Sequence, residues 1–244
     1  MEELIQFDKQ LLLLLNGSDS LYLDGVALTL THAATWIPLY LSLLFMVIKN
    51  NINWRTVLLI LACSGLCVLL AGSVDDSIVK PLVARWRPTH DPQIGSLVDV
   101  VNDYRGGNYG FFSAHASNTF SIAVFFSLLV RSRALTVGLV AYSLTNCWTR
   151  LYLGVHYPGD ILVGLLWGAT VGTSVYFLER YLSTLLAANR DKAGRRQASV
   201  RHYTSARFTS SGYEHRTVWV VLAVLLLTFV YAFVRAAFMM DSIT

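Results

Sequence analysis

Long apolar stretches alternate with short polar breaks along most of this chain. A helix needs about 20 predominantly apolar residues to cross a hydrocarbon layer of roughly 30 Å. Runs of that length lie at residues 25–48, 55–79, 113–131, 134–153, 158–179 and 217–239. The pattern predicts an all-α integral membrane protein, a six-helix bundle built as a single domain over residues 1–244.

The segment before the first run, EELIQFDKQLLLLLN, is amphipathic. Its apolar run is short, follows two acidic residues and lacks a small-residue cleavage site, so it does not read as a signal peptide. We expect a short N-terminal helix that lies at the membrane interface.

Composition supports a membrane protein, because 55% of the residues are hydrophobic and only 14% are charged. The mean hydropathy of +0.51 exceeds what a soluble core requires. Cys63, Cys67 and Cys147 all fall inside apolar runs. Cysteine buries as a small hydrophobe, so we expect these three to pack rather than to bind metal or form disulfides.

Basic residues are distributed unequally between the two sides of such a bundle. One side holds the turns 49–54 and 131–133 and the connection 180–216, and it carries 12 of the 19 lysines and arginines. By the positive-inside rule this side is cytoplasmic. The basic connection is expected to be solvated or to attract anionic headgroups, and nucleic-acid binding is not expected. The last run, 217–239, has no candidate catalytic residue and is expected to serve as a packing or anchoring helix.

Polar residues gather at three places on the predicted outer side. The first is KPLVARWRP, where Pro88 must end any helix. Lys80 and Arg87 are seven residues apart, close to two helical turns, so both could grip one anion. The alternative is that Lys80, Arg85 and Arg87 are cations that anchor the helix end at the interface.

The second place is the start of the third run, SAHASNTF. Ser113 is a good N-cap, and a helix N-terminus offers N–H groups and positive potential to an anion. His115 in the first turn would lie near a phosphate bound there. The alternative is that His115 is simply a hydrogen-bonded polar residue.

The third place is TRLYLGVHYPGD, between the fourth and fifth runs. Arg150 ends one helix, His156 lies in the turn, Pro158 suits the first position of the next helix, and Asp160 falls in its first turn. Ionisable groups at this depth are costly and usually mark function.

The candidate site residues at these places are three cations (Lys80, Arg87 and Arg150), two histidines and one carboxylate. That set is poor for a divalent metal, because the cations oppose it and only one anionic ligand is present. It suits a phosphate. A histidine oriented by an aspartate can attack phosphorus, a second histidine can protonate the departing oxygen, and the cations can neutralise the transition state. We therefore predict phosphoryl transfer to water without metal or cofactor.

The three motifs resemble the signature of the type 2 phosphatidic acid phosphatase superfamily, which includes bacterial lipid phosphatases. KPLVARWRP matches its first part in full. FSAH, at 112–115, replaces the family's PSGH, and threonine replaces the serine before Arg150, with the remaining spacing intact. The resemblance covers residues 80–160 by motif and the six-span layout more loosely.

The resemblance implies a role for each matching residue. His156 would form a phosphohistidine, Asp160 would orient it, and His115 would be the general acid. The residues that hold phosphate would be Lys80, Arg87, Ser113, Ala114 (through its N–H) and Arg150.

It also implies a multi-pass protein of the bacterial inner membrane with its active site facing the periplasm. The partners would be a lipid phosphate substrate and membrane lipids, and a monomer is favoured. Lipid A is slightly favoured as substrate over undecaprenyl diphosphate, phosphatidylglycerol phosphate and phosphatidic acid. The loop 95–110, with Asp99, Asp103 and Arg105, is expected to shape headgroup choice.

Three other functions remain open from the sequence. His115, His156 and Asp160 could instead support metal-dependent hydrolysis. The cations could bind a headgroup in a carrier that cleaves nothing. A haloperoxidase is less compatible with six spans, because those relatives are soluble. Finally, Gly164, Gly168 and Gly172 recur every four residues, which favours close packing against a helix of the same chain.

Overall fold

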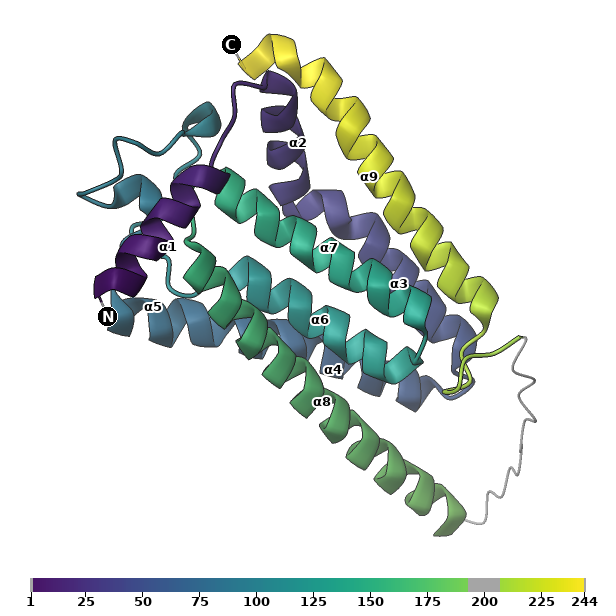
Figure 1. Ribbon diagram of the computed structural model, residues 1–244. Coiled ribbons are helices and arrows are strands. Elements are labelled where there is room, and N and C mark those ends of the chain that lie inside the picture. Colours follow the sequence, from purple (N-terminus) through teal and green to yellow (C-terminus); the bar gives the residue numbers. More distant parts are fainter. Residues whose placement is uncertain (1, 193–206, 244) are drawn as a thin grey trace.

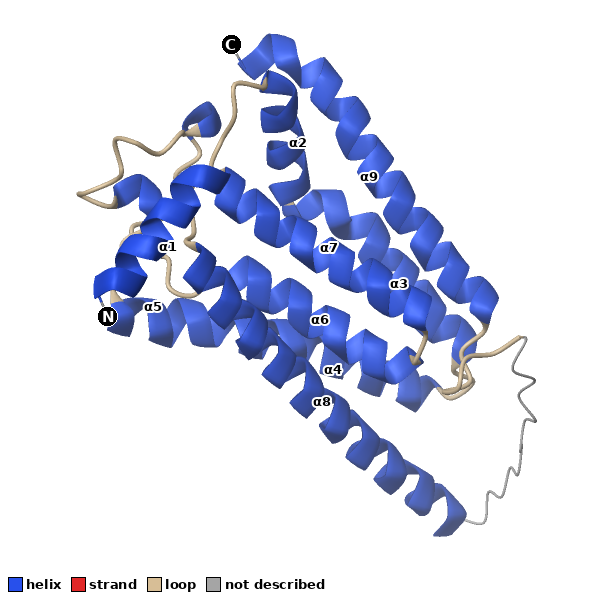
Figure 2. Cartoon of the chain, viewed as in Figure 1, coloured by secondary structure: helices blue, strands red, loops and turns tan. Residues whose placement is uncertain are grey.

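The computed structural model describes residues 2–192 and 207–243, and it is helical throughout its regular elements, with two isolated antiparallel bridges (Figure 2). Most of the basic connection 180–216 lies outside the described residues. The helices are α1 (Glu2–Leu15), α2 (Leu21–Thr31), α3 (Ile37–Asn50), α4 (Trp54–Val74), α5 (Lys80–Val83), α6 (Ala114–Val130), α7 (Arg133–Tyr152), α8 (Pro158–Lys192) and α9 (His215–Ile243).

Four helical segments in the described chain are long and apolar enough to cross a membrane. They are Ala33–Asn50, Trp54–Val83, Pro158–Ala188 and His215–Met239. The all-helical prediction is confirmed, but the count of six spans is not. The helix α6 is apolar but has only 17 residues, and α7 carries polar side chains that are buried within the protein.

The bundle is organised around α6, which packs against α8, α7 and α4, while α2 and α3 pack against α9 (Figure 1). Inside it, Thr119 Oγ1 and Ser143 Oγ are hydrogen-bonded at 2.8 Å between α6 and α7. Polar residues on these two helices thus find partners inside the protein. The cysteines Cys63, Cys67 and Cys147 are buried and free, as expected for packing residues.

The glycines of α8 bring that helix against α6. A Cβ at Gly164, Gly168 or Gly172 would come within 2.5–2.7 Å of a backbone oxygen of α6. The prediction that these glycines pack within the chain is confirmed. Close contact also fixes the first turn of α8 beside the first turn of α6, and Ser113 N donates to the Asp160 carbonyl oxygen at 3.1 Å.

Two predicted runs are interrupted by turns that are not α-helical. The first breaks at His32, where α2 ends and a short 3₁₀ turn, Ala33–Trp36, leads into α3. The second continues from α4 through a π-helical turn, Asp75–Val79, into α5 and ends at Val83. Ala84 has a left-handed backbone with φ of 47°, so the helix stops before Pro88.

The N-terminal helix α1 lies across the ends of α7 and α8 (Figure 1). Asn16 Nδ2 donates to the Tyr152 carbonyl at 2.8 Å, and Gly159 N donates to Asp8 Oδ1 at 2.8 Å. The predicted helix is confirmed, and its position at the membrane interface stays a prediction. Its contacts tie α1 to the turn that carries His156.

Candidate active site

His156 lies in the turn between α7 and α8 and is 2% exposed. Its Nε2 is 3.1 Å from Nη1 of Arg87. A guanidinium has only donors, so Nε2 must be the acceptor and the ring proton of the neutral histidine must be on Nδ1. Nδ1 faces Asp160 Oδ2 at 3.6 Å, which is longer than a hydrogen bond. The lone pair that a nucleophile needs is therefore on the side of the arginine.

Asp160 is fully buried and held from two directions. Its Oδ2 accepts from the backbone N–H of Tyr157 at 2.9 Å, and its Oδ1 accepts from Arg85 Nη1 at 2.7 Å. Because Pro158 begins α8, the carboxylate falls in the first turn and bonds back to the turn before it. The carboxylate is thus oriented toward the imidazole before any ligand binds.

Arg85 was missed by the sequence reasoning, which placed it among interfacial cations. Its Nη2 donates to Asp8 Oδ2 at 2.7 Å, and its guanidinium lies 4.1 Å from the ring centroid of Tyr157. Burial opposes its charge, but the charges of Asp160 and Asp8 raise the pKa of Arg85. A chain of contacts therefore runs from α1 through Arg85 to Asp160 and on to His156.

Arg87 reaches the site from an extended segment. The prediction that Lys80 and Arg87 share one helical face is wrong, because the helix ends four residues before Arg87. Instead, Arg87 N donates to the Asn108 carbonyl at 2.9 Å, and Gly110 N donates to the Arg85 carbonyl at 3.0 Å. A Cβ at Gly110 would lie 2.9 Å from Arg87 Cγ, so glycine lets this loop pass close to the arginine.

Arg150 ends α7, as predicted, and is 2% exposed. Its Nη1 donates to Tyr104 Oη at 3.1 Å, and its Nε lies 3.4 Å from Thr149 Oγ1. Among the described residues its buried Nη2 has no partner. A buried charged donor without an acceptor lowers the stability of the fold, so this nitrogen is suited to bind an anion.

The loop 95–110 borders the site through Tyr104 rather than through its charged residues. Asp103 and Arg105 are exposed and pair with each other at 3.0 Å. Asp99 instead contacts the residue that follows α1, because its backbone N–H donates to Asn16 Oδ1 at 2.7 Å. The influence of this loop on headgroup choice stays a prediction.

The remaining predicted residues border the site around His156 and Arg150. Ser113 caps α6 and is fully buried, with Ala114 next to it. His115 interacts electrostatically with Arg150, His156, Arg87 and Lys80. Lys80 Nζ lies 2.8 Å from Asp75 Oδ2 and 2.5 Å from Asp76 Oδ1. This pairing with two acidic residues was not anticipated, and it offsets part of the positive charge.

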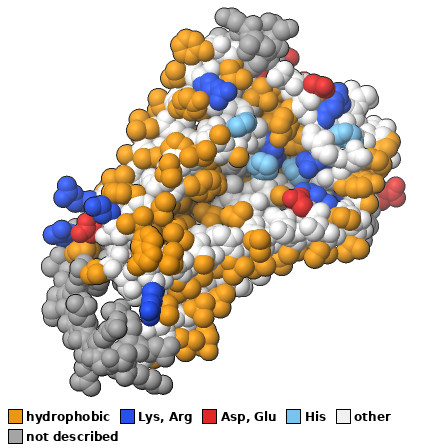
Figure 3. Space-filling model, turned by 180° about the vertical axis from the view of Figure 1, so that it is seen from behind, with side chains coloured by type: hydrophobic (Ala, Val, Ile, Leu, Met, Phe, Trp, Pro, Cys, Tyr) orange, Lys and Arg blue, Asp and Glu red, His pale blue; other side chains and the backbone are white. Residues whose placement is uncertain are grey.

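Charged and histidine side chains gather on one face of the molecule, surrounded by hydrophobic side chains (Figure 3). Such a placement suits a ligand with a charged head and an apolar body. Most of the predicted site residues come from three separate stretches of sequence that the packing of α6, α7 and α8 brings together.

The protonation state of His156 is set by its surroundings. Burial and the charges of Arg87, Arg150 and Lys80 lower the pKa of His156 well below its usual value. Because a lowered pKa lets the imidazole stay neutral to a lower pH, we expect ¹⁵N spectra of histidine-labelled protein to show a neutral Nδ1–H imidazole for His156 at pH 6. The exposed His32 serves as comparison in the same spectrum. A protonated His156 at that pH would contradict the tautomer inferred from Arg87.

The model of the PAP2 superfamily matches residues 53–184, more than half of the chain. The chain belongs to the PAP2 superfamily. Curated PAP2-like relatives include the lipid A 4'-phosphatase of Bacteroides thetaiotaomicron, 37% identical over 84% of this chain and 92% of the relative. The lipid A 4'-phosphatase of Porphyromonas gingivalis is 33% identical over 74% of this chain and 76% of the relative.

A third relative is the decaprenylphosphoryl-5-phosphoribose phosphatase of Mycobacterium tuberculosis, 33% identical over 59% of this chain and 71% of the relative. No solved structure matches the chain. Membership of the PAP2 superfamily makes this protein a phosphoric ester hydrolase, and its apolar helices and relatives indicate a multi-pass membrane protein.

Proposed function

We propose that this protein removes a phosphate from a membrane lipid through a phosphohistidine on His156. The observation that carries the proposal is the pair of arginines around that histidine. Arg87 lies against Nε2 at 3.1 Å, and Arg150 has a buried Nη2 without a partner among the described residues. A phosphate oxygen would satisfy both cations while its phosphorus faced the histidine.

In the first step, Nε2 of His156 attacks phosphorus as the bond to the lipid oxygen breaks. The negative charge of the bound phosphate offsets the nearby cations and keeps His115 protonated in the complex. His115 then gives this proton to the departing oxygen, so the lipid leaves as an alcohol. Asp160 stabilises the positive charge that develops on the imidazole. Lys80, Arg87, Arg150 and the N-terminal N–H groups after Ser113, including that of Ala114, neutralise the equatorial oxygens.

In the second step, water attacks the phosphohistidine and returns the enzyme. His115, now neutral, takes a proton from the water as its oxygen bonds to phosphorus. The nitrogen–phosphorus bond breaks and inorganic phosphate leaves. Each group thus resumes its starting protonation state, and the cycle requires neither metal nor cofactor.

Lipid A is the substrate that we favour, since two relatives that align over most of this chain are named lipid A 4'-phosphatases. The mycobacterial relative acts by its name on a decaprenyl lipid, so a polyprenyl phosphate is the main alternative. The excess of basic residues on the opposite side of the bundle supports an active site that faces the periplasm from the bacterial inner membrane.

Phosphate release from purified lipids tests the proposal. We expect turnover of hexa-acylated lipid A to exceed that of undecaprenyl diphosphate, phosphatidylglycerol phosphate and phosphatidic acid. Activity should persist in excess EDTA, because arginines and a lysine supply the positive charge, and it should fall with vanadate, which mimics the transferring phosphoryl group.

Two results would count against this mechanism. Loss of turnover in EDTA, with recovery on adding Zn²⁺ or Mg²⁺, would favour metal-dependent hydrolysis. Lipid binding without any phosphate release would favour a carrier. If undecaprenyl diphosphate were the preferred substrate, the proposed mechanism would stand and lipid A would be wrong as the substrate.

A further inference from the structure

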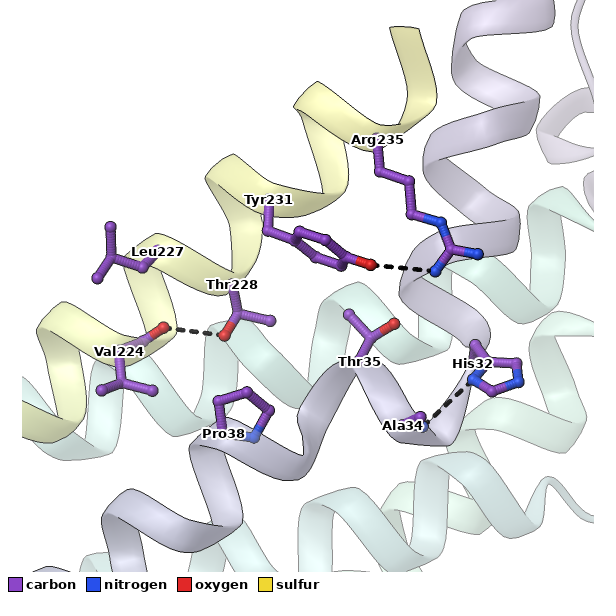
Figure 4. A pocket seen from close by; sticks show the side chains of 9 residues that line it. All are labelled: His32, Ala34, Thr35, Pro38, Val224, Leu227, Thr228, Tyr231 and Arg235. Carbon is purple, nitrogen blue, oxygen red and sulfur yellow. Dashed lines mark hydrogen bonds between the residues drawn. The ribbon is translucent and has the colours of Figure 1, made fainter. Parts of the chain in front are cut away.

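A groove of about 500 Å³ lies between α9 and the segment that joins α2 to α3 (Figure 4). Its apolar wall includes Pro38 on one side and Val224 and Leu227 on the other. The volume falls in the range of pockets that hold small organic ligands or parts of them. Nothing in the proposed chemistry of His156 uses this groove.

One end of the groove presents hydrogen-bond donors. His32 Nδ1 accepts from Ala34 N at 3.3 Å, so the proton of the neutral ring is on Nε2. Arg235 Nη1 donates to Tyr231 Oη at 3.2 Å, and this is the one hydrogen bond of its guanidinium within the described residues. Figure 4 shows Arg235 and His32 at the same end, away from Val224 and Leu227. No acidic residue lines the groove in the described chain, so its charge complements an anion.

The donor end is close to the phosphate site. Thr31, the residue before His32, has its Oγ1 3.3 Å from Thr149 Oγ1, which in turn lies 3.4 Å from Arg150 Nε. Adding the length of the Thr31 side chain and one Cα–Cα step of about 3.8 Å, the Cα atom of His32 lies within about 13 Å of Arg150 Nε. The donor end of the groove is thus within the span of a large lipid headgroup from Arg150.

We propose that this groove binds the lipid substrate itself. Arg235 and His32 bind a second anionic group, a phosphate or carboxylate, on the same headgroup whose phosphate is cleaved. One acyl chain lies along Pro38, Val224 and Leu227. The inference rests on the proposed function and adds to it a preference for lipids that carry two anionic groups.

Steady-state kinetics with matched lipids tests the site. The probes are lipid A with two phosphates, lipid A with the 4'-phosphate alone, and the soluble ester para-nitrophenyl phosphate. For Arg235→Ala with His32→Ala, we expect KM for the two-phosphate lipid to rise about tenfold with kcat unchanged. KM for the one-phosphate lipid should rise less than threefold, and turnover of the soluble ester should not change.

A second variant tests the apolar wall. Leu227→Trp fills the groove and should raise KM for both lipids while leaving the soluble ester unaffected. Arg133→Ala serves as control, since Arg133 is an exposed cation at the other end of the bundle. If the double variant does not fold, the single variants Arg235→Lys and His32→Gln are measured instead. Both should keep most of the native difference in KM between the two lipids. Arg235→Gln, which removes the charge, should lose that difference.

The outcomes distinguish a failure of the second-anion site from a failure of the proposed phosphatase function. If the native protein releases phosphate from no lipid, the proposed function fails and the inference with it. If the native protein is active and the Arg235→Ala, His32→Ala double variant raises KM equally for both lipids, or leaves it unchanged, only the second-anion site is overturned. A parallel loss on the soluble ester would point to damage at the catalytic histidine instead.

Discussion

Replacing His156 by alanine is expected to lower lipid phosphate release by about 10⁴-fold or more, because no other side chain can take over the bond to phosphorus. Its Nε2 is 3.1 Å from Arg87, and its ring is buried. The measurement is phosphate release per minute by purified protein. Alkaline quenching of a single turnover with ³²P-labelled lipid should label the native chain and leave His156→Ala unlabelled.

His90→Ala provides the matched control. His90 lies in the same outer loop region, where its Nδ1 pairs with Thr89 Oγ1 at 3.1 Å, and it has no part in the proposed chemistry. It should keep native turnover. Substantial activity in His156→Ala, or labelled protein in its absence, would show that the phosphoryl group is carried elsewhere or passes directly to water.

Replacing Arg85 by methionine is expected to lower kcat by about 100-fold with little change in KM. The change leaves Asp160 buried without its 2.7 Å partner, and removing one member of a buried ion pair costs about 3–5 kcal/mol. A carboxylate that rotates away or takes up a proton no longer stabilises the imidazolium. Arg85 acts here as a positioning residue, since its contacts are to Asp160 and Asp8.

The pH profile distinguishes positioning from general damage. Losing the guanidinium favours protonated Asp160, so Arg85→Met should regain activity as pH rises, whereas a merely unfolded fraction should not. Arg85→Lys should restore part of the rate by returning the charge. Asp8→Asn, which spares the bond to Asp160, should cost less than tenfold, and Arg133→Met should match the native protein. If Arg85→Met lost the same fraction of kcat at every pH, and Arg85→Lys restored none of it, Arg85 would not be a positioning residue for Asp160.

The positions of the candidate site residues were predictable from short stretches of sequence, because each motif is local. Ser113 caps α6, Arg150 ends α7, His156 lies in a turn, and Asp160 follows Pro158 in the first turn of α8, all as the spacing indicated. Capping preferences and the fixed geometry of the helix start act over a few residues, so sequence suffices for them.

Arg85 and Arg87 mark the point where local reasoning failed. Helical spacing suggested that Lys80 and Arg87 share a face, but a left-handed residue at Ala84 ends the helix. An antiparallel bridge to residues 108–110 then sets the direction of both arginines. That pairing joins segments more than 20 residues apart, and no periodicity within either one encodes it.

The sequence by itself determined that this is a helical, apolar chain, and it indicated the residues that we propose for phosphoryl transfer. Those properties follow from hydropathy and from spacing within single helices and turns. Only the tertiary structure decided which nitrogen of His156 carries the proton, that Arg85 holds Asp160, and that Asp8 on α1 joins them. These contacts join residues that are far apart in the sequence. They depend on how the helices pack together, which the pattern within a single segment does not determine.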